Sequence, residues 1–384
     1  MYAVTVVGGG AIGLNIAIKL FKEGWETNLI EEHKGVGKPT NCSGLLSLEG
    51  LEKLNIDVKD IALNYINGTI VYTPDLASLE INAGKKVAVV VDRHQFDLMF
   101  YSQAKNLGVP IKFNTKALNI NGNTLFVQNK GRGELIKSRI ILGADGVSSS
   151  IRKSMGLELP TTNFIQAYQE FIKGDFKETK KVLVFMDTAF EGFFAWLIPI
   201  SSTDAEIGLG VKLGADIKEA IIVLKEKLKQ LGYDYTVKEK RSFMIPYNKM
   251  LDTLVKNNLM IAGDAAFQTK STTGGGLIFG LNCSNKAVDA IGDYLKYQKP
   301  LEAYQEKVMP FRKELELHWK IRSYLNKQSN NDLNSLMRKL KDAGIEEFLG
   351  EYGNMDEPSK FVPMLMKKPK FWLMAPQLIK FMTS

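Results

Sequence analysis

Apolar residues near the start of the chain fall into strand-length runs separated by a segment of helical periodicity. Residues 3–7 form a β-branched apolar run. The segment after it has its apolar residues at helical spacing: Leu14, Ala17, Ile18 and Phe21. Gly24 ends this helix, and a second strand is predicted over residues 27–30. A strand, a helix and a strand in this order predict a parallel βαβ unit.

The pattern changes over residues 160–245. Runs such as VLVFMD, FFAWLIPI and EIGLGVKL are typical of strands in an antiparallel sheet. Helices are predicted over 91–108 and 216–231, and a strand at 259–262 leads into a second glycine-rich loop. Residues 301–384 are predicted to be largely helical. The fold class is therefore α/β, with a second unit built on an antiparallel sheet.

A glycine motif joins the first strand to the first helix. Gly8, Gly10 and Gly13 match the spacing G-x-G-x-x-G, with Ala11 and Ile12 between the last two. Gly8 permits a tight turn, Gly10 lets the backbone approach a pyrophosphate, and Gly13 lets the helix pack against the strand. Unpaired N–H groups at the helix start favour phosphate oxygens. The motif predicts a dinucleotide site.

An acidic strand end follows the motif at the spacing expected for a ribose ligand. Glu31 stands directly after the predicted second strand. Its carboxylate would accept hydrogen bonds from the adenosine ribose. Glu32 lies past the strand end and is the second candidate for this contact.

Charge and chain length exclude several classes of function. The chain has 384 residues and a formal net charge of +8, but its lysines are scattered. No motif for RNA or DNA is visible, so nucleic acid is not an expected partner. The net positive charge would attract a membrane surface or a phosphorylated substrate, or it reflects a generally basic surface with no particular partner. The chain opens without a signal-peptide pattern and contains no apolar run of about 18 residues, so we expect a cytoplasmic protein.

Cysteine and histidine are too sparse for a disulfide framework or a metal site. The cysteines are Cys42 and Cys283, and the histidines are His33, His94 and His318. No two of them have metal-ligand spacing, and two distant cysteines cannot hold an iron–sulfur cluster.

Three separated stretches resemble one family. GGGAIG with Glu31, GADGVSSSIR and GDAAFQTKSTTGGG are similar to the three FAD fingerprints of the flavoprotein hydroxylase superfamily, which has the para-hydroxybenzoate hydroxylase-like fold. The resemblance implies FAD in a Rossmann-like domain of the glutathione-reductase type. It implies that Asp264 contacts ribityl or ribose hydroxyls and that Arg93 lies near the pyrophosphate. Asp145, Gly146 and Gly263 belong to the same motifs and are predicted to bind the cofactor.

The glycine run of the third motif has a physical role beside the flavin. Gly274, Gly275 and Gly276 let the backbone approach the isoalloxazine ring, and Leu277 begins the next helix. N–H groups at a helix start can stabilise negative charge on the N1–C2=O edge of reduced flavin. The family usually has a proline where this chain has Ser271.

Two further motifs indicate a branch of the superfamily. The P-x-x-C-S-G pattern, carried by Pro39, Cys42, Ser43 and Gly44, resembles the geranylgeranyl reductase family. That family also has P-x-x-Y-x-W-x-F-P along its lipid tunnel. Here Trp196 and Pro199 are kept, whereas Glu191, Phe194 and Ile198 replace the first proline, the tyrosine and the phenylalanine.

The resemblance implies a reductase that hydrogenates C=C bonds of prenyl chains of isoprenoid lipids, with hydride from flavin N5. Cys42, Ser43 and Gly44 would form a wall of small volume beside flavin and substrate, with a reactive thiol as the alternative role of Cys42. Phe194 and Trp196 point to the same face of a strand and would line the slot, or else form ordinary sheet core. These five residues are the catalytic candidates.

The sequence allows more than one proton donor, electron donor and type of reaction. Tyr168 and Tyr247 are candidate acids, and ferredoxin or NAD(P)H could supply electrons because no second dinucleotide motif is present. Rival functions on the same fold are a flavin monooxygenase, a flavin halogenase and a FixC-like electron-transfer flavoprotein. Residues 194–199 resemble the W-x-W-x-I-P motif of flavin halogenases, with Phe194 in place of the first tryptophan.

The predicted domain boundaries complete the interpretation. They are an FAD-binding domain over 1–50, 90–158 and 250–300, a catalytic domain over 51–89 and 159–249, and a helical C-terminal region over 301–384. In the last region, apolar residues from Phe361 to Phe381 alternate with lysines, which suits either a segment at the inner face of the membrane or a helical lid.

Overall fold

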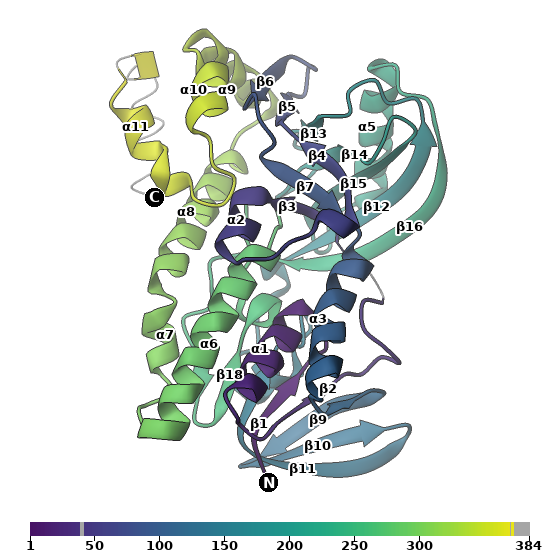
Figure 1. The fold of residues 1–384 in the computed structure, drawn as a ribbon. Coiled ribbons are helices and arrows are strands. Elements are labelled where there is room, and N and C mark those ends of the chain that lie inside the picture. The colour runs from purple at the N-terminus through teal and green to yellow at the C-terminus, as the bar shows by residue number, and fades with distance from the viewer. Residues whose placement is uncertain (39–41, 369, 372–384) are drawn as a thin grey trace.

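The computed structural model describes residues 1–38, 42–368 and 370–371 (Figure 1). Its first sheet has the strand order β17-β18-β11-β1-β2-β8, and β10 and β9 extend from β11. The strands are β1 (Tyr2–Val7), β2 (Thr27–Ile30), β8 (Ile111–Lys112), β9 (Thr115–Asn121), β10 (Thr124–Asn129), β11 (Arg132–Gly143), β17 (Val255–Lys256) and β18 (Leu259–Ile261). β1 pairs in parallel with β2 and β11, which confirms the predicted βαβ unit.

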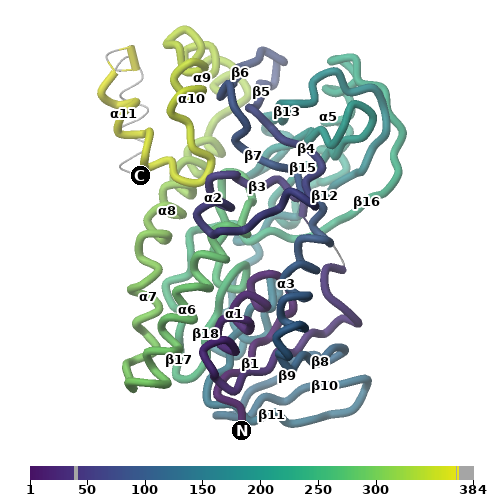
Figure 2. The backbone as a smooth tube through the Cα atoms, in the orientation of Figure 1, coloured from purple at the N-terminus to yellow at the C-terminus, as the bar shows by residue number. Residues whose placement is uncertain are grey.

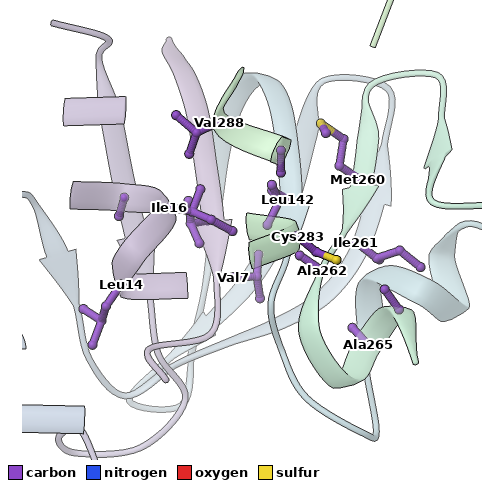
Figure 3. Close-up of a cluster of buried hydrophobic side chains, with 14 of the residues drawn as sticks. Val7, Leu14, Ile16, Leu142, Met260, Ile261, Ala262, Ala265, Cys283 and Val288 are labelled. Carbon is purple, nitrogen blue, oxygen red and sulfur yellow. The ribbon is translucent and has the colours of Figure 1, made fainter. Parts of the chain in front are cut away.

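Helices cover this first sheet because its central strands are apolar on both faces. The helices are α1 (Ala11–Lys22), α3 (Arg93–Leu107), α4 (Ser150–Ser154) and α6 (Leu277–Tyr297). α1 packs against both α3 and α6. Figure 3 shows part of the resulting core, where Leu14 and Ile16 of α1 and Cys283 of α6 lie beside the strands. Cys283 is fully buried, as core packing requires.

A second sheet has the order β16-β12-β15-β14-β13-β5-β6. Its strands are β5 (Gly68–Tyr72), β6 (Ser78–Asn82), β12 (Phe164–Gly174), β13 (Lys181–Phe185), β14 (Ala195–Pro199), β15 (Asp204–Lys212) and β16 (Tyr235–Pro246). The pairs are antiparallel, as expected, except that β13 runs parallel to β5. No hairpin constrains that pair, because α3 and the strands from β8 to β11 separate the two strands in sequence.

The two faces of the second sheet have different neighbours. α5 (Ile217–Gln230) covers one face and packs with Leu183, Leu197 and Ile207. The other face carries Phe194 and Trp196 together with Ile165 and Ile245. This second face lies toward the first sheet and supplies one wall of the site described below.

A small third sheet connects the two larger ones. β7 (Ala88–Val91) lies between β3 (Leu45–Ser47) and β4 (Ala62–Ile66), and α2 (Leu48–Lys53) follows β3. The strands assigned by prediction to the FAD-binding and catalytic domains thus fall largely into separate sheets. The domain boundaries themselves stay a prediction.

The C-terminal region is helical, as predicted. Its helices are α7 (Ala303–Lys307), α8 (Met309–Leu325), α9 (Asn330–Asp342), α10 (Ile345–Tyr352) and α11 (Val362–Met366), and the 3₁₀ turn η4 (Pro358–Lys360) precedes α11. Three further 3₁₀ turns lie elsewhere along the chain: η1 (Lys59–Ile61), η2 (Thr161–Asn163) and η3 (Gly263–Ala266). Figure 2 shows α8 running beside α6 from one half of the molecule to the other.

The end of this region packs against the second sheet. Leu365 and Phe371 are buried in a cluster with Leu79, Ile345 and Phe348. The described part of the segment from Phe361 to Phe381 therefore has a packed apolar side. Trp372, Leu378 and Phe381, which belong to the same predicted segment, lie outside the described residues. Within the part of the chain that the structure covers, no helix is long and apolar enough to cross a bilayer.

Candidate functional site

The first glycine turn is closed on one side and open on the other. Gly8 has φ +108°, and a Cβ there would lie 2.3 Å from the carbonyl oxygen of Ala144. A Cβ on Gly13 would lie 2.0 Å from the carbonyl oxygen of Gly8. Gly10, which precedes α1, has no atom within 4 Å of an added Cβ. The start of α1 therefore faces open space with its N–H groups free of any side-chain cap.

Glu31 stands at the end of β2, buried beside this turn. Its Oε2 accepts a hydrogen bond from the Gly9 N–H at 2.6 Å, and its Oε1 accepts one from the His33 N–H at 2.9 Å. Glu32 is half-exposed and pairs with Lys116 at 3.4 Å. Of the two candidates, Glu31 is the one held rigidly at the strand end.

Asp145 has a role in the local fold. Its carboxylate accepts hydrogen bonds from the Ser149 hydroxyl at 2.5 Å and from the Ser150 N–H at 2.7 Å, so it holds the start of α4. Gly146 beside it has φ +71°. Arg152, buried on α4, donates to the carbonyl oxygen of Ala265 at 3.2 Å and thereby joins the second motif to the third.

Arg93, at the start of α3, lies beside the cysteine loop. It donates to both carboxylate oxygens of Asp97, at 2.8 and 2.9 Å. Burial disfavours the charge, but Cys42 and Asp97 beside it hold the pKa of Arg93 above its ordinary value. Its buried Nε has no hydrogen-bond partner among the described residues. The loop thiol thus has a cationic neighbour from a distant part of the sequence.

The third motif forms a tight loop before α6. Gly274 has φ +73°, and a Cβ on Gly276 would lie 2.7 Å from Thr269 Oγ1 and 2.9 Å from Asp264 Oδ1. The Thr269 hydroxyl donates to Asp264 at 3.1 Å. Burial raises the pKa of Asp264. The loop leaves no room for side chains where its backbone faces the cavity.

These elements surround a cavity of about 1130 Å³. Every predicted site residue lines it except Gly13 and Gly44. Gly13 packs against Gly8. Gly44 has φ +72°, and a Cβ added to it would lie 2.1 Å from the Val91 carbonyl oxygen. Both are therefore required by the backbone rather than by a ligand contact. Pro39 of the cysteine motif lies outside the described residues.

The far wall of the cavity is apolar and aromatic. The rings of Phe193 and Phe194 stack at 4.3 Å, and Trp196 follows at 5.7 Å from Phe194. The Trp196 indole lies flat on Gly208, where an added Cβ would be 2.3 Å from Cζ2. Its N–H donates to Glu206 at 3.3 Å. Burial raises the pKa of Glu206 to about 8, so the carboxyl behind the wall is mainly neutral at pH 7.

A second set of buried polar groups comes from the C-terminal region. Lys270 pairs with Asp356 at 2.5 Å, and His318 lies 2.7 Å from Thr272 Oγ1 and 3.0 Å from the Asp356 carbonyl oxygen. Burial lowers the pKa of His318 to about 4. Lys270 and Thr272 line the cavity. Sequence reasoning missed these groups because their partners lie 46 and 86 residues away.

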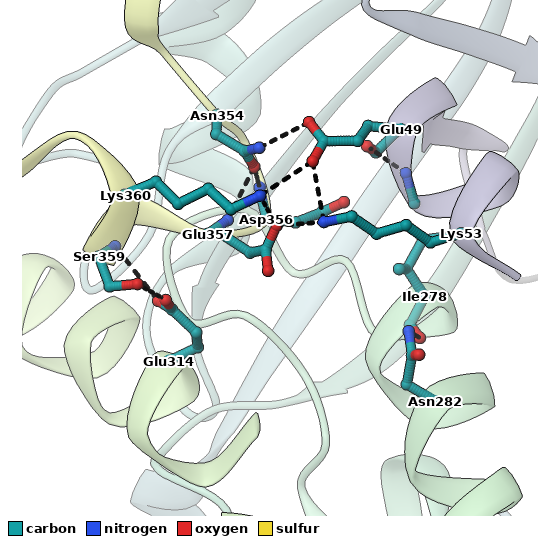
Figure 4. Close-up of polar contacts among 12 residues, drawn as sticks. Glu49, Lys53, Ile278, Asn282, Glu314, Asn354, Asp356, Glu357, Ser359 and Lys360 are labelled. Carbon is teal, nitrogen blue, oxygen red and sulfur yellow. Dashed lines mark hydrogen bonds and ion pairs between the residues drawn. The ribbon is translucent and has the colours of Figure 1, made fainter. Parts of the chain in front are cut away.

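Surface contacts hold the segment that carries Asp356. In Figure 4, Asn354 donates to Glu49 of α2 at 2.8 Å, and Lys53 reaches Glu357 at 2.5 Å. Lys360 contacts both Glu49 and Glu357. The segment after α10 is thereby fastened to α2, and its Met355 lines the cavity.

The residues present fit FAD. Gly10 leaves open space at the start of α1, where a ligand can approach the backbone, and Arg93, which lines the cavity, has a buried Nε with no hydrogen-bond partner among the described residues. An acidic strand end and an uncapped helix start are placed as a dinucleotide requires. Among the described residues, no group of histidine, cysteine, aspartate and glutamate side chains could hold a metal.

The fold and the site define a flavoprotein: the chain belongs to the FAD binding domain family, whose model matches residues 1–316. FAD is its cofactor, and the family predicted from the three motifs is confirmed. The chain is 25% identical over 399 residues to the digeranylgeranylglycerophospholipid reductase of Methanocaldococcus jannaschii, covering 99% of this chain and 97% of that protein.

Solved structures share the fold. A geranylgeranyl bacteriochlorophyll reductase-like protein from Thermoplasma acidophilum has a TM-score of 0.85 at 19% identity, covering 98% of this chain and 99% of that one. The p-nitrophenol 4-monooxygenase PnpA of Pseudomonas putida has a TM-score of 0.72 at 16% identity, covering 91% and 96%. At these identities the likeness concerns the fold alone.

Proposed function

We propose that the protein hydrogenates C=C bonds in the prenyl chains of isoprenoid lipids. When bound and reduced, FAD supplies hydride from N5 to one carbon of the double bond. The single observation that carries the proposal is the aromatic, apolar wall beside the glycine loop, built from Phe193, Phe194 and Trp196. The relatives named as digeranylgeranylglycerophospholipid reductases support it.

An unactivated alkene offers the protein no polar group to grip. The chain's own residues therefore act by positioning the hydrocarbon and by keeping water away. Phe194 and Trp196 provide an apolar aromatic surface, and the buried contact with Glu206 fixes the indole. Cys42 and Ser43 line the same cavity and leave volume for a chain.

The two tyrosines considered as acids lie elsewhere. The Tyr168 hydroxyl donates to Glu170 at 2.5 Å, on the side of the sheet covered by α5. The Tyr247 hydroxyl donates to the Gly192 carbonyl oxygen at 2.6 Å. Neither lines the cavity. We therefore assign neither tyrosine as the proton donor, because each hydroxyl donates to a protein acceptor and neither residue lines the cavity.

The apolar wall also bears on the rival reactions. A monooxygenase for a polar aromatic substrate needs groups that anchor the substrate, whereas Val182, Val184 and Ile198 continue the wall here. A prenyl-lipid substrate, an external electron donor and contact with a membrane surface remain parts of the proposal.

The test is anaerobic incubation of reduced holoenzyme with geranylgeranyl lipids, followed by mass spectrometry. Wild type should add two hydrogen atoms per reduced double bond. Trp196→Ala should lose most of this activity, and Leu135→Ala, which changes an exposed residue on β11, should keep it. Unchanged lipid with wild type, or addition of an oxygen atom in air, would overturn the proposal.

A further inference from the structure

One buried positive charge at the cavity has no negatively charged partner among the described residues. Arg322 of α8 is 3% exposed and lines the cavity. Its Nε donates to the Ser271 carbonyl oxygen at 3.1 Å, and its two terminal nitrogens donate to the carbonyl oxygens of Phe193 at 3.1 Å and Thr272 at 2.6 Å. All three acceptors are neutral.

The other buried cations at the cavity are compensated. Arg93 is paired with Asp97 and Lys270 with Asp356. In the described parts of the chain, no carboxylate forms an ion pair with Arg322. Burial lowers the pKa of Arg322 to about 10, which leaves its guanidinium charged at neutral pH. A buried charge without a counter-ion is costly. The site therefore favours an anion beside Arg322 when it is in use.

The position of Arg322 indicates which anion this is. Ser271 and Thr272 belong to the loop that continues into Gly274, Gly275 and Gly276. The guanidinium also lies over the rings of Phe193 and Phe194, with its carbon 5.3 and 5.1 Å from the ring centroids. It stands where the glycine loop meets the apolar wall. The glycines and the aromatic rings suit a flavin and a hydrocarbon better than a phosphate headgroup.

We propose that Arg322 is the fixed positive charge that stabilises the anionic, reduced form of the bound flavin and so raises its reduction potential. Two electrons and one proton convert neutral oxidised flavin to this anion, and Arg322 forms no covalent bond and transfers no proton. The proposal rests on the proposed function insofar as reduced flavin is the hydride donor there. The potential is measured without lipid, and lipid binding by the same variants is measured separately.

The test compares Arg322→Gln with Arg322→Lys in the FAD-loaded protein, by equilibration with a reference dye. Loss of the charge should weaken binding of reduced relative to oxidised FAD about tenfold, which for a two-electron couple lowers the potential by about 30 mV. Arg322→Lys, which keeps the charge but loses the fork of donors, should retain most of the wild-type potential. Lys313→Gln removes an exposed charge from the same helix and should have no effect.

A purely structural role would give a different pattern. In that case both Arg322 variants would lose FAD or thermal stability together, and their bound flavin would keep the wild-type potential. That result overturns the proposal. An equal fall of the flavin reduction potential in Arg322→Gln and Arg322→Lys also overturns it. Loss of lipid binding with an unchanged potential would assign the charge to a lipid phosphate instead, and so would also overturn it.

A second measurement covers the case in which the variants do not fold. The FAD of the wild-type protein should have a more positive potential than free FAD at the same pH, and a more negative one contradicts the proposal. If the lipid assay fails while these potential shifts are found, the proposed function falls and the role of Arg322 stands.

Discussion

The neutral carboxyl behind the aromatic wall makes a prediction about stability and pH. Glu206 is 1% exposed on β15, and its partner is the indole N–H of Trp196. Glu206→Gln keeps an acceptor oxygen for this N–H and removes the titrating proton. The substitution therefore isolates the effect of ionisation from the effect of packing.

The magnitude follows from the two pKa values. Burial raises the pKa of Glu206 to about 8 from an ordinary value of 4.5. One pKa unit corresponds to about 1.4 kcal/mol, so the shift lowers the free energy of unfolding at high pH by about 5 kcal/mol. Below the lower value both folded and unfolded chains hold the proton. Between the two values only the folded chain holds it, so wild-type stability falls as pH rises, and above about 8 the loss is complete.

The assay is urea unfolding of the FAD-loaded protein at about pH 5 and about pH 8. The free energy of unfolding of Glu206→Gln, relative to that of wild type, should rise by several kcal/mol between the lower and the higher pH. Glu226→Gln, an exposed substitution on α5, should follow wild type at both pH values. If Glu206→Gln also follows wild type, the carboxyl is not buried as described and the reasoning is refuted.

Two further predictions concern the cofactor turn and the buried ion pair. Gly8→Ala should lose most of its bound FAD because a Cβ there meets Ala144 at 2.3 Å, whereas Gly133→Ala, with open space around it, should keep a full complement; full flavin absorbance in Gly8→Ala contradicts this. Lys270→Met should destabilise the protein by about 3–5 kcal/mol because it leaves Asp356 buried and unpaired. Adding Asp356→Leu should recover much of that loss, and a further loss of similar size would show that the pair is not coupled.

Local patterns predicted the elements well. β2 has the bounds predicted for the second strand, and α5 differs from the prediction by one residue at each end. Apolar periodicity reports which face of an element is buried, and that property belongs to each segment by itself. Glycine spacing likewise located the turn at Gly8, because its positive φ is a local requirement.

Contacts between distant segments could not be predicted in this way. Arg322 meets Thr272 only because α8 runs beside the glycine loop, and Cys42 meets Arg93 only because β3 and β7 pair. Nothing in the sequence around Glu206 distinguishes it from an exposed residue on a strand edge. The same limit explains Gly44, whose motif position suggested a place beside flavin and substrate although it makes room for the Val91 carbonyl oxygen, whereas the packing role expected of Gly13 agrees with its close approach to Gly8.

The most direct test of the central claim is a single turnover without oxygen. Reduced holoenzyme is mixed with a geranylgeranyl lipid, and the flavin absorbance and the lipid mass are followed together. Reoxidation of the flavin with loss of one double bond per FAD is the predicted result. Flavin that stays reduced in the presence of the lipid, at a concentration where lipid binding is demonstrated, would contradict the account.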